Sequence, residues 1–159
     1  MSSRDVRHKG VPMSLTWLNL ACLPDVGTIS SASVVPVTAD GKIVLAKLAR
    51  GLEIPGGDVI VSDPDIEAAA RREAWEETCI RLGPLVLIQL VRVEQNTPLA
   101  VVRHVVVYAG RVTSMPTFVQ ENESAGRVVV SPDEYIERVG FGHADDRRLL
   151  VTQAMAAVR

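Results

Sequence analysis

The sequence predicts an α/β fold of the α+β type, in which helices pack on a mixed sheet. The chain has 159 residues, of which 47% are hydrophobic, so it can bury one substantial core but hardly two. Short valine-rich segments separated by turn residues stand before and after one segment rich in alanine, glutamate and arginine. A second helical pattern closes the chain. This order of strands, helix, strands and helix is typical of a mixed sheet covered by helices.

The first elements are expected to be strands. Residues 1–10 are polar, and we expect them to be frayed. Residues 31–37 are rich in valine and serine and predict a strand, and residues 43–48 predict the returning strand. Asp40 and Gly41 lie between them, and this pair is the strongest short-range signal for a hairpin.

Two longer segments predict helices. Residues 63–78 begin with Asp63 and Pro64, which are a good N-cap and a good first-turn residue. The rest of this segment consists mainly of strong helix formers. Residues 143–158 place apolar side chains at helical spacing and predict a closing helix.

The region between these helices predicts two strands, a loop, a short strand and a short helix. Residues 85–93 and 100–112 are expected to pair as antiparallel strands. Residues 116–126 carry a cluster of acids and amides and predict a loop, and residues 127–130 predict a strand. Residues 131–134 read Ser-Pro-Asp-Glu, a capping box that should open a short helix.

Composition and charge exclude several classes of protein. The net charge is -2, the pI is about 5.9, and no basic run exceeds two residues, so a surface for DNA is not expected. No apolar stretch reaches 18 residues, so no membrane span is expected. Cys22 and Cys79 are too few for a disulfide framework, which favours a cytoplasmic location. We expect one domain over residues 29–159 and an N-terminal extension over residues 1–28, which could support a homodimer.

Three glutamates stand out in the first helical segment. Glu73, Glu76 and Glu77 are spaced i, i+3 and i+4, so they fall within an arc of about 100° on a helix. Like charges at this spacing repel one another. A solvated acidic face is the common explanation for such a cluster. A divalent cation is the alternative, because Mg²⁺ binds carboxylate oxygens and keeps other positions for waters and phosphates.

The rest of the helical wheel favours the cation. The glutamates share their arc with Ile66, Ala69 and Ala70, whereas the opposite side carries Glu67, Arg71, Trp75 and Thr78. The acids therefore lie on the small, apolar side that should face the sheet. Carboxylates there are costly to desolvate unless they are paired or bound to a metal. Arg72 flanks the cluster and could pair with Glu76.

A double glycine precedes this helix and completes the pattern. Gly56 and Gly57 follow a proline, and a residue without Cβ lets a backbone carbonyl come close to a metal. The whole pattern resembles the signature of the Nudix hydrolases, the Nudix box G-x5-E-x7-R-E-U-x-E-E-x-G-U, where U is aliphatic. The matching residues are Gly57, Arg72, Glu73, Glu76, Glu77 and Ile80. The resemblance extends over about residues 30–158 and implies the Nudix α/β/α sandwich.

The sequence departs from the Nudix box at two places. It is one residue longer between Gly57 and Arg72, and Asp63 is the best substitute for the first glutamate, with an architectural role. Cys79 replaces the terminal glycine. If that residue keeps a left-handed backbone, the substitution costs about 1 kcal/mol.

The resemblance implies a metal-dependent hydrolase that cleaves a pyrophosphate linkage in a nucleoside diphosphate joined to another group. The substrate would be a nucleotide, a nucleotide sugar or a nucleoside triphosphate, and the cofactor Mg²⁺ or alternatively Mn²⁺. The alternatives are a nucleotide-binding or sensor module of the same fold with weak or no hydrolysis, and an interaction domain with incidental acids.

The same resemblance assigns roles to individual residues. The implied metal ligands are Glu73, Glu76, Glu77, the carbonyl of Gly56 and one acid of a later loop, Glu121 or Glu123, with Glu123 favoured. The implied catalytic residues are Glu73, Glu76 and Arg72, and the general base is either Glu76 or the loop acid. Lys47, Arg50 and Glu53 are candidates for contacts with the substrate.

Overall fold

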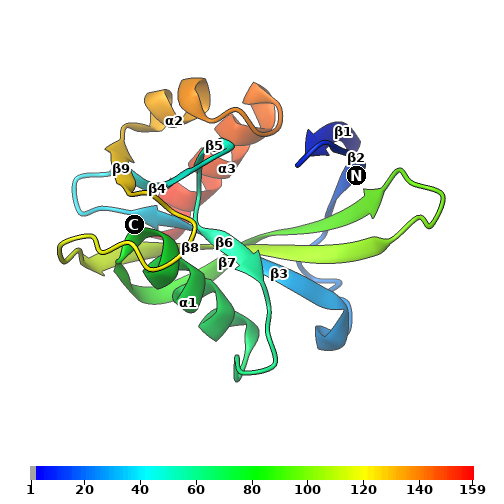
Figure 1. The fold of residues 1–159 in the computed structure, drawn as a ribbon, viewed down its shortest axis with the longest axis horizontal. Coiled ribbons are helices and arrows are strands. Elements are labelled where there is room, and N and C mark those ends of the chain that lie inside the picture. The colour runs from blue at the N-terminus through cyan, green and yellow to red at the C-terminus, as the bar shows by residue number, and fades with distance from the viewer. Residues whose placement is uncertain (1–2) are drawn as a thin grey trace.

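The computed structural model describes residues 3–159, which form one mixed sheet with three helices packed on it (Figure 1). The strands are β1 (Ser3–His8), β2 (Val11–Leu18), β3 (Ile29–Val37), β4 (Ile43–Leu48), β5 (Gly51–Glu53), β6 (Gly56–Asp58), β7 (Arg81–Gln95), β8 (Val102–Ser114) and β9 (Arg127–Val130). The helices are α1 (Ile66–Thr78), α2 (Pro132–Arg138) and α3 (Ala144–Ala157), with a short 3₁₀ turn η1 (Val26–Thr28) before β3. The predicted fold class is confirmed.

The strand order explains why β3 and β4 separate over most of their length. The main path is β1-β2-β7-β8-β3-β4-β5, and the β3–β8 pair is parallel whereas the other pairs are antiparallel. β3 pairs with β4 through Val37 and Ile43 only, because β6 occupies the first part of the same edge of β3. The two strands therefore diverge, and residues 56–58 lie between them.

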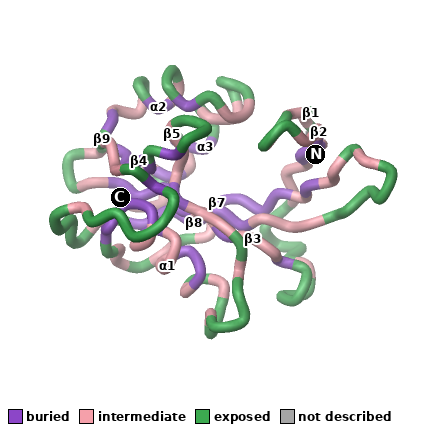
Figure 2. Tube along the Cα trace, in the orientation of Figure 1, coloured by how far each residue is buried: buried purple, intermediate pink, exposed green. Residues whose placement is uncertain are grey.

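The core consists of two layers on opposite faces of the central strands. Successive side chains of a strand point to opposite faces. Val35 accordingly packs in the layer beneath α2 and α3, and Val34 packs in the layer beneath α1. Figure 1 shows α1 on one side of the sheet and α2 with α3 on the other. The buried stretches of the chain follow the central strands, and the exposed ones follow the connecting loops (Figure 2).

Most predicted elements are present, and α1 begins later than expected. The predicted capping box is confirmed, because Ser131 Oγ accepts from the Glu134 N–H at 3.1 Å and Glu134 Oε1 accepts from the Ser131 N–H. The predicted start of α1 at Asp63 is wrong. Asp65 is the N-cap, and its side chain accepts from the Ala68 N–H at 2.7 Å. Asp63 instead stays in the preceding loop, bound to a helix arginine described below.

The prediction that the N-terminal residues are frayed is wrong for residues 3–8. They form β1, which pairs with β2 across a two-residue turn in which Lys9 and Gly10 both have positive φ. β2 in turn pairs with β7, so the extension adds two strands to the sheet. The sequence carries a signal for this arrangement, since apolar and polar residues alternate from Val11 to Trp17. Within residues 3–159, no helix is long and apolar enough to cross a bilayer.

Candidate active site

Helix α1 carries the three glutamates, and the sheet fixes how deeply each one is buried. Ala69, Ala70 and Ala74 are fully buried and let the helix pack closely against the strands. Glu77 shares this inward side and is 3% exposed. The Glu73 side chain is 13% exposed and that of Glu76 is 33% exposed. The trio therefore projects from the inward flank of the helix, with Glu76 at its outer limit.

One residue of the expected outer side is also buried. Thr78 was grouped with the solvent-facing residues of α1, and this expectation is wrong. Its hydroxyl donates to the Ala74 carbonyl at 2.6 Å, which satisfies the polar group without water.

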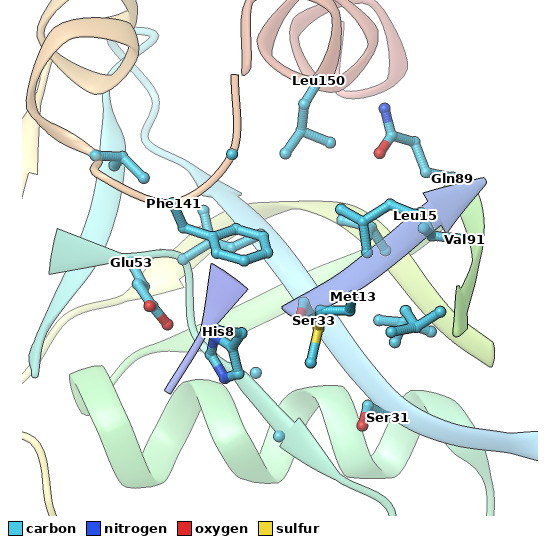
Figure 3. A pocket seen from close by; sticks show the side chains of 18 of the residues that line it. His8, Met13, Leu15, Ser31, Ser33, Glu53, Gln89, Val91, Phe141 and Leu150 are labelled. Carbon is cyan, nitrogen blue, oxygen red and sulfur yellow. The ribbon is translucent and has the colours of Figure 1, made fainter. Parts of the chain in front are cut away.

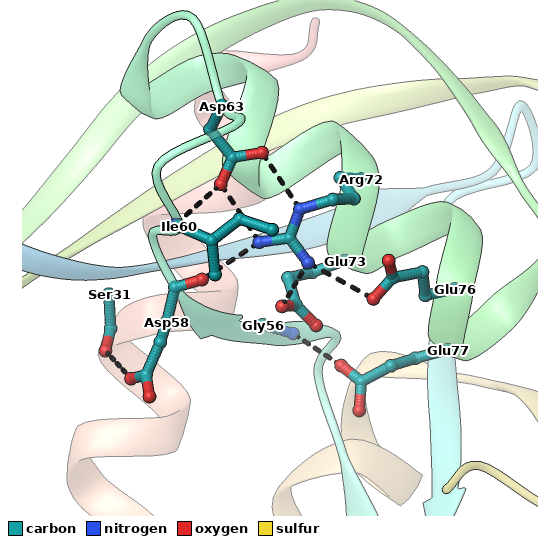
Figure 4. A network of polar contacts seen from close by, with 9 residues as sticks. All are labelled: Ser31, Gly56, Asp58, Ile60, Asp63, Arg72, Glu73, Glu76 and Glu77. Carbon is teal, nitrogen blue, oxygen red and sulfur yellow. Dashed lines mark hydrogen bonds and ion pairs between the residues drawn. The ribbon is translucent and has the colours of Figure 1, made fainter. Parts of the chain in front are cut away.

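Arg72 organises the acidic side of the site (Figure 4). Its guanidinium donates two hydrogen bonds to Asp63, of 2.9 and 3.0 Å. It also donates to Glu73 at 2.8 Å, to Glu76 at 3.2 Å and to the Asp58 carbonyl at 2.9 Å. Hydrogen bonding from Arg72 lowers the pKa of Asp63 below its usual value. Arg72 thus ties the loop before α1 to two of the glutamates, and Asp63 has the architectural contact expected of it.

The two glycines before the helix are required by close contacts. A Cβ on Gly56 would clash with Ser33, the residue opposite it on β3, and would lie 2.9 Å from the Ser33 Cα. A Cβ on Gly57 would lie 2.6 Å from Glu73 Oε1. The Gly56 N–H also donates to Glu77 Oε1 at 2.8 Å. The glycines therefore let β6 run directly beside both β3 and the carboxylates of α1.

The electrostatics of Glu77 fit a site for a cation. Burial raises its pKa to about 7, and the hydrogen bond from Gly56 opposes this only in part. Its second oxygen, Oε2, is buried and has no hydrogen-bond partner among the described residues. Burial also raises the pKa of Glu73, while Arg72 opposes that shift. A positive ion stabilises a carboxylate that is desolvated and has a hydrogen bond on only one of its two oxygens. These residues therefore fit a divalent cation.

The carboxylates are not gathered into a finished cage. Across residues 3–159, no three His, Cys, Asp or Glu side chains lie together in a metal-binding arrangement. Glu73 and Glu76 are instead turned toward Arg72, and Glu77 toward Gly56 (Figure 4). To bind one ion together, the two outer glutamates would have to exchange contacts with Arg72 for contacts with the ion.

A cleft of about 710 Å³ opens beside these residues. Gly56, Gly57 and Glu73 line it, whereas Glu76 and Glu77 do not appear in its lining. Among the other predicted residues, Arg50, Glu53 and Glu123 line the cleft and Lys47 does not. The expected contact of Lys47 with the substrate therefore has no support from its position.

Arg50 connects the remaining candidates at the rim. Its Nε donates to Glu53 Oε1 at 3.0 Å, and its Nη1 lies 3.9 Å from Glu123 Oε1. Glu123 is 63% exposed, and its charge contributes to the raised pKa of Glu77, after burial and the charge of Glu73. The structure thus brings the loop acid to the same side of the cleft as the buried glutamate.

Sequence reasoning missed much of the cleft wall. Figure 3 shows His8, Met13 and Leu15 of the N-terminal hairpin facing the cleft, with Val91 of β7 and Phe141 near them. The alternating pattern of β2 could have indicated an inward-facing strand. No local signal could have shown that this strand lies beside β7, because the two are far apart in the sequence.

The comparison with protein families decides the identity of this arrangement. Residues 27–152 match the model of the NUDIX domain. The chain belongs to the Nudix family. No curated protein matches the sequence.

Solved Nudix structures share the fold at low sequence identity. The pyrophosphohydrolase BsRppH of Bacillus subtilis is 19% identical, with a TM-score of 0.73, over 99% of this chain and 97% of that protein. The NUDIX domain of NrtR from Shewanella oneidensis, in complex with ADP ribose, is 16% identical, with a TM-score of 0.64, over 87% and 95% of the two chains. A NUDIX hydrolase from Nitrosomonas europaea is 21% identical, with a TM-score of 0.62, over 82% and 91%.

Cys79, which the sequence pattern matches to the terminal glycine of the Nudix box, has the left-handed backbone that glycine favours. It is the C-cap of α1 with φ 51° and ψ 45°, and its N–H donates to the Trp75 carbonyl at 2.9 Å. Its buried sulfur lies 3.5 Å from both the N and the O of Val119. Arg127 donates to the Thr78 and Cys79 carbonyls at 3.0 and 3.4 Å and so satisfies the end of the helix. The turn is therefore preserved, at a cost of about 1 kcal/mol in backbone strain.

Proposed function

We propose that this Nudix chain hydrolyses a pyrophosphate linkage in a nucleoside diphosphate joined to another group, with Mg²⁺ or alternatively Mn²⁺ as cofactor. One observation carries the proposal: Glu77 is buried, is partnered on one oxygen only, and lies one helical turn from Glu73 beside Gly56 and Gly57. Nudix hydrolases generally need divalent metal ions. A buried acid of this kind is costly without a cation and useful with one.

The proposed ligands are the carboxylates of Glu73, Glu76 and Glu77, the carbonyl of Gly56 and the carboxylate of Glu123. The ion would neutralise negative charge on the phosphates, which is the main requirement of phosphoryl-group hydrolysis. Arg72 would hold the side chains of Glu73 and Glu76 in place until the ion is bound.

The remaining roles belong to water activation and to substrate contacts. Glu76 is the most exposed of the three clustered glutamates, and Glu123 is an exposed acid at the rim, so either can take the proton of the attacking water. Arg50 would contact a phosphate, because its guanidinium lines the cleft between two acids. Glu53 would orient Arg50 through their 3.0 Å hydrogen bond.

A second candidate function is a nucleotide-binding module that hydrolyses poorly. Two observations favour it. Arg72 already occupies two of the proposed metal ligands, and one structural neighbour, the NrtR domain, is known in complex with ADP ribose. Turnover in the presence and absence of metal separates this candidate from the first.

The test is a panel of ADP ribose, a nucleotide sugar and a nucleoside triphosphate, each incubated with Mg²⁺, with Mn²⁺ or with a chelator. We expect release of a nucleoside monophosphate or of pyrophosphate with either metal and none with the chelator. Glu77→Gln should lower kcat by about a hundredfold or more, since it removes one charged ligand. Glu67→Gln is the matched control, because Glu67 is an exposed acid of the same helix outside the cleft lining.

The outcomes separate the candidates. Turnover that persists undiminished in the chelator, or in Glu77→Gln, contradicts the proposed site. Nucleotide binding without turnover supports the binding module. A homodimer stays a prediction, which light scattering of the purified chain would test.

A further inference from the structure

The cleft extends well beyond the acidic residues, onto a face of the sheet that the N-terminal hairpin completes. This part of the cleft, which we call its hairpin half, is lined by Met13 and Leu15 of β2, Val91 and Val93 of β7 and Val105 of β8. The pairing of these strands places their side chains on one continuous surface. A volume of about 710 Å³ is in the upper part of the range for small-molecule sites and exceeds what a diphosphate alone requires.

The surface in this half of the cleft is mainly aliphatic, with His8, Lys9 and Gln95 toward the end of the hairpin. Its buried amide, that of Gln89, already has hydrogen-bond partners. Gln89 is 7% exposed and accepts from the Trp17 Nε1–H at 3.1 Å. Its amide nitrogen donates to Gln153 at 2.7 Å. The Gln89 amide therefore holds β2 and α3 against β7. The floor of the hairpin half, formed by the strand residues named above, presents methyl and methylene groups. Such a floor binds an apolar group more favourably than a hydroxylated one, whose hydrogen bonds to water would be lost.

Arg103 lies where the acidic and aliphatic halves meet. It precedes Val105 by two residues on β8, so both side chains point to the cleft, and both line it. Its Nη1 is 4.0 Å from Asp58 Oδ1, and the Asp58 side chain is 75% exposed and accepts from the Ser31 hydroxyl. Arg103 Nε is buried and has no hydrogen-bond partner within the described part of the chain. The guanidinium thus has unused donors beside the site proposed for the diphosphate, and arginine is well suited to bind phosphate.

We propose that the hairpin half of the cleft is a specificity subsite for an aliphatic group of the substrate, and that Arg103 binds the phosphate that bears this group. This inference rests on the proposed function and specifies its substrate class: a nucleoside diphosphate esterified with an uncharged, apolar group. The hairpin residues Met13 and Leu15 lie outside residues 27–152, which match the NUDIX domain, so part of this subsite comes from a segment beyond that match.

The test compares two substrates that differ only in the apolar group, the methyl and the hexyl ester of ADP, with Mg²⁺ present. Hydrolysis of either gives AMP and the alkyl phosphate. We expect kcat/KM to be at least about tenfold higher for the hexyl ester, because its additional methylenes are removed from water. Met13→Gln should reduce this ratio to within about threefold, because it places an amide on the floor at similar volume.

Two control variants keep the comparison specific. Val6→Thr changes the same hairpin at a position that packs against the apolar cluster but does not line the cleft, so it should leave the ratio unchanged.

Arg103→Gln should raise KM for both esters about tenfold with little change in kcat, and Arg103→Lys should restore part of the loss. Arg92→Gln should change neither, because Arg92 is on the neighbouring strand, pairs with Glu94 and is not part of the cleft lining.

The outcomes distinguish this inference from the proposed function. Hydrolysis of both esters at equal kcat/KM overturns the aliphatic subsite and leaves the proposed function standing. Equal KM values in Arg103→Gln and in the original chain overturn the role of Arg103. If neither ester and no member of the panel of ADP ribose, nucleotide sugar and nucleoside triphosphate is hydrolysed with Mg²⁺ or Mn²⁺, the proposed function fails, and the substrate subsite fails with it.

Discussion

The acidic half of the cleft and its hairpin half are built in different ways. The acidic half comes mainly from one contiguous segment, residues 56–77, with Arg50, Glu53 and Glu123 at its rim. That segment is fastened by the five hydrogen bonds that Arg72 donates and by the bond from Gly56 to Glu77. The hairpin half combines three strands that are neighbours in the sheet, β2, β7 and β8, of which β2 is distant from the other two in the sequence, with the segment before α3. The N-terminal hairpin contacts that segment and α3 through an ion pair of Arg4 with Asp146, a hydrogen bond between His143 and the Asp5 carbonyl, and the T-shaped packing of His8 on Phe141.

This difference suits the acidic half to catalysis and the hairpin half to substrate selectivity. The densely bonded half can hold carboxylates at fixed positions, which charge stabilisation at a phosphate requires. The hairpin half presents mainly apolar contacts, whose strength depends on area more than on orientation. A change in the hairpin can therefore alter which group is bound without displacing the carboxylates.

Replacing Arg72 with alanine should have the largest effect on stability. It would leave the Asp63 side chain, only 4% exposed, without its arginine and with the Ile60 N–H as its remaining donor, and would bring Glu73 and Glu76 into unscreened repulsion. We expect the free energy of unfolding to fall by about 3 kcal/mol, measured by urea denaturation at pH 7.5. Arg148→Ala is the control, since Arg148 is an exposed helix arginine, and it should change stability by less than about 0.5 kcal/mol. A loss this small in Arg72→Ala would show that the acidic half is not held by its network.

The two glycines of β6 should differ in what their replacement disturbs. In Gly56→Ala the new Cβ meets the backbone of Ser33, which cannot move without shifting β3, so we expect a loss of about 2 kcal/mol. In Gly57→Ala the Cβ meets only the end of the flexible Glu73 side chain, so stability should fall by less than about 1 kcal/mol. Gly57→Ala should nevertheless weaken metal-dependent turnover, because it displaces a proposed ligand. Equal thermal stability of the two variants would contradict this distinction.

Glu77 should make the metal-free protein less stable as the pH rises. Its pKa in the folded chain is about 7, above the ordinary value of 4.5, so the folded state binds the proton more tightly than the unfolded state. Ionisation between about pH 4.5 and 7 therefore costs stability. Glu77→Gln removes this cost and should stabilise the chain by about 1–2 kcal/mol at pH 8 in a chelator, with no gain at pH 4.

Denaturation at both pH values with Glu67→Gln as control checks this prediction. Mg²⁺ should raise the unfolding temperature of the original chain at pH 8 and should have a much smaller effect on Glu77→Gln. A variant that is less stable than the original chain at pH 8 without metal would contradict the raised pKa.

The same contrast between local and distant contacts explains which features could be predicted. The turn at Asp40 and Gly41 and the box of Ser131 and Glu134 depend on residues close in sequence, and each was predicted from a few letters. The helix N-cap was misplaced because Asp63, a good cap by type, is bound by an arginine nine residues later.

The hairpin half could not be predicted for the corresponding reason. Its floor depends on the register between β2 and β7, which pairs Leu15 with Val93, 78 residues apart. Arg103 carries no sequence motif, and its position beside Asp58 follows only from the pairing of three strands. Sequence indicated the proposed ligands of the ion but gave no means of locating the proposed subsite for the apolar group.

The smallest effect on stability is expected where the hairpin meets α3. Arg4 Nε lies 3.3 Å from Asp146 Oδ2, but it lacks hydrogen-bond geometry, and the Arg4 side chain is 40% exposed. Arg4→Ala should therefore change the free energy of unfolding by no more than about 0.5 kcal/mol. Because β1 is an edge strand, the same variant should still speed amide hydrogen exchange in residues 3–8 while leaving α1 unchanged. Faster exchange in α1 as well would show that the two halves of the cleft unfold together, and the separation of chemistry from selectivity would then have no structural basis.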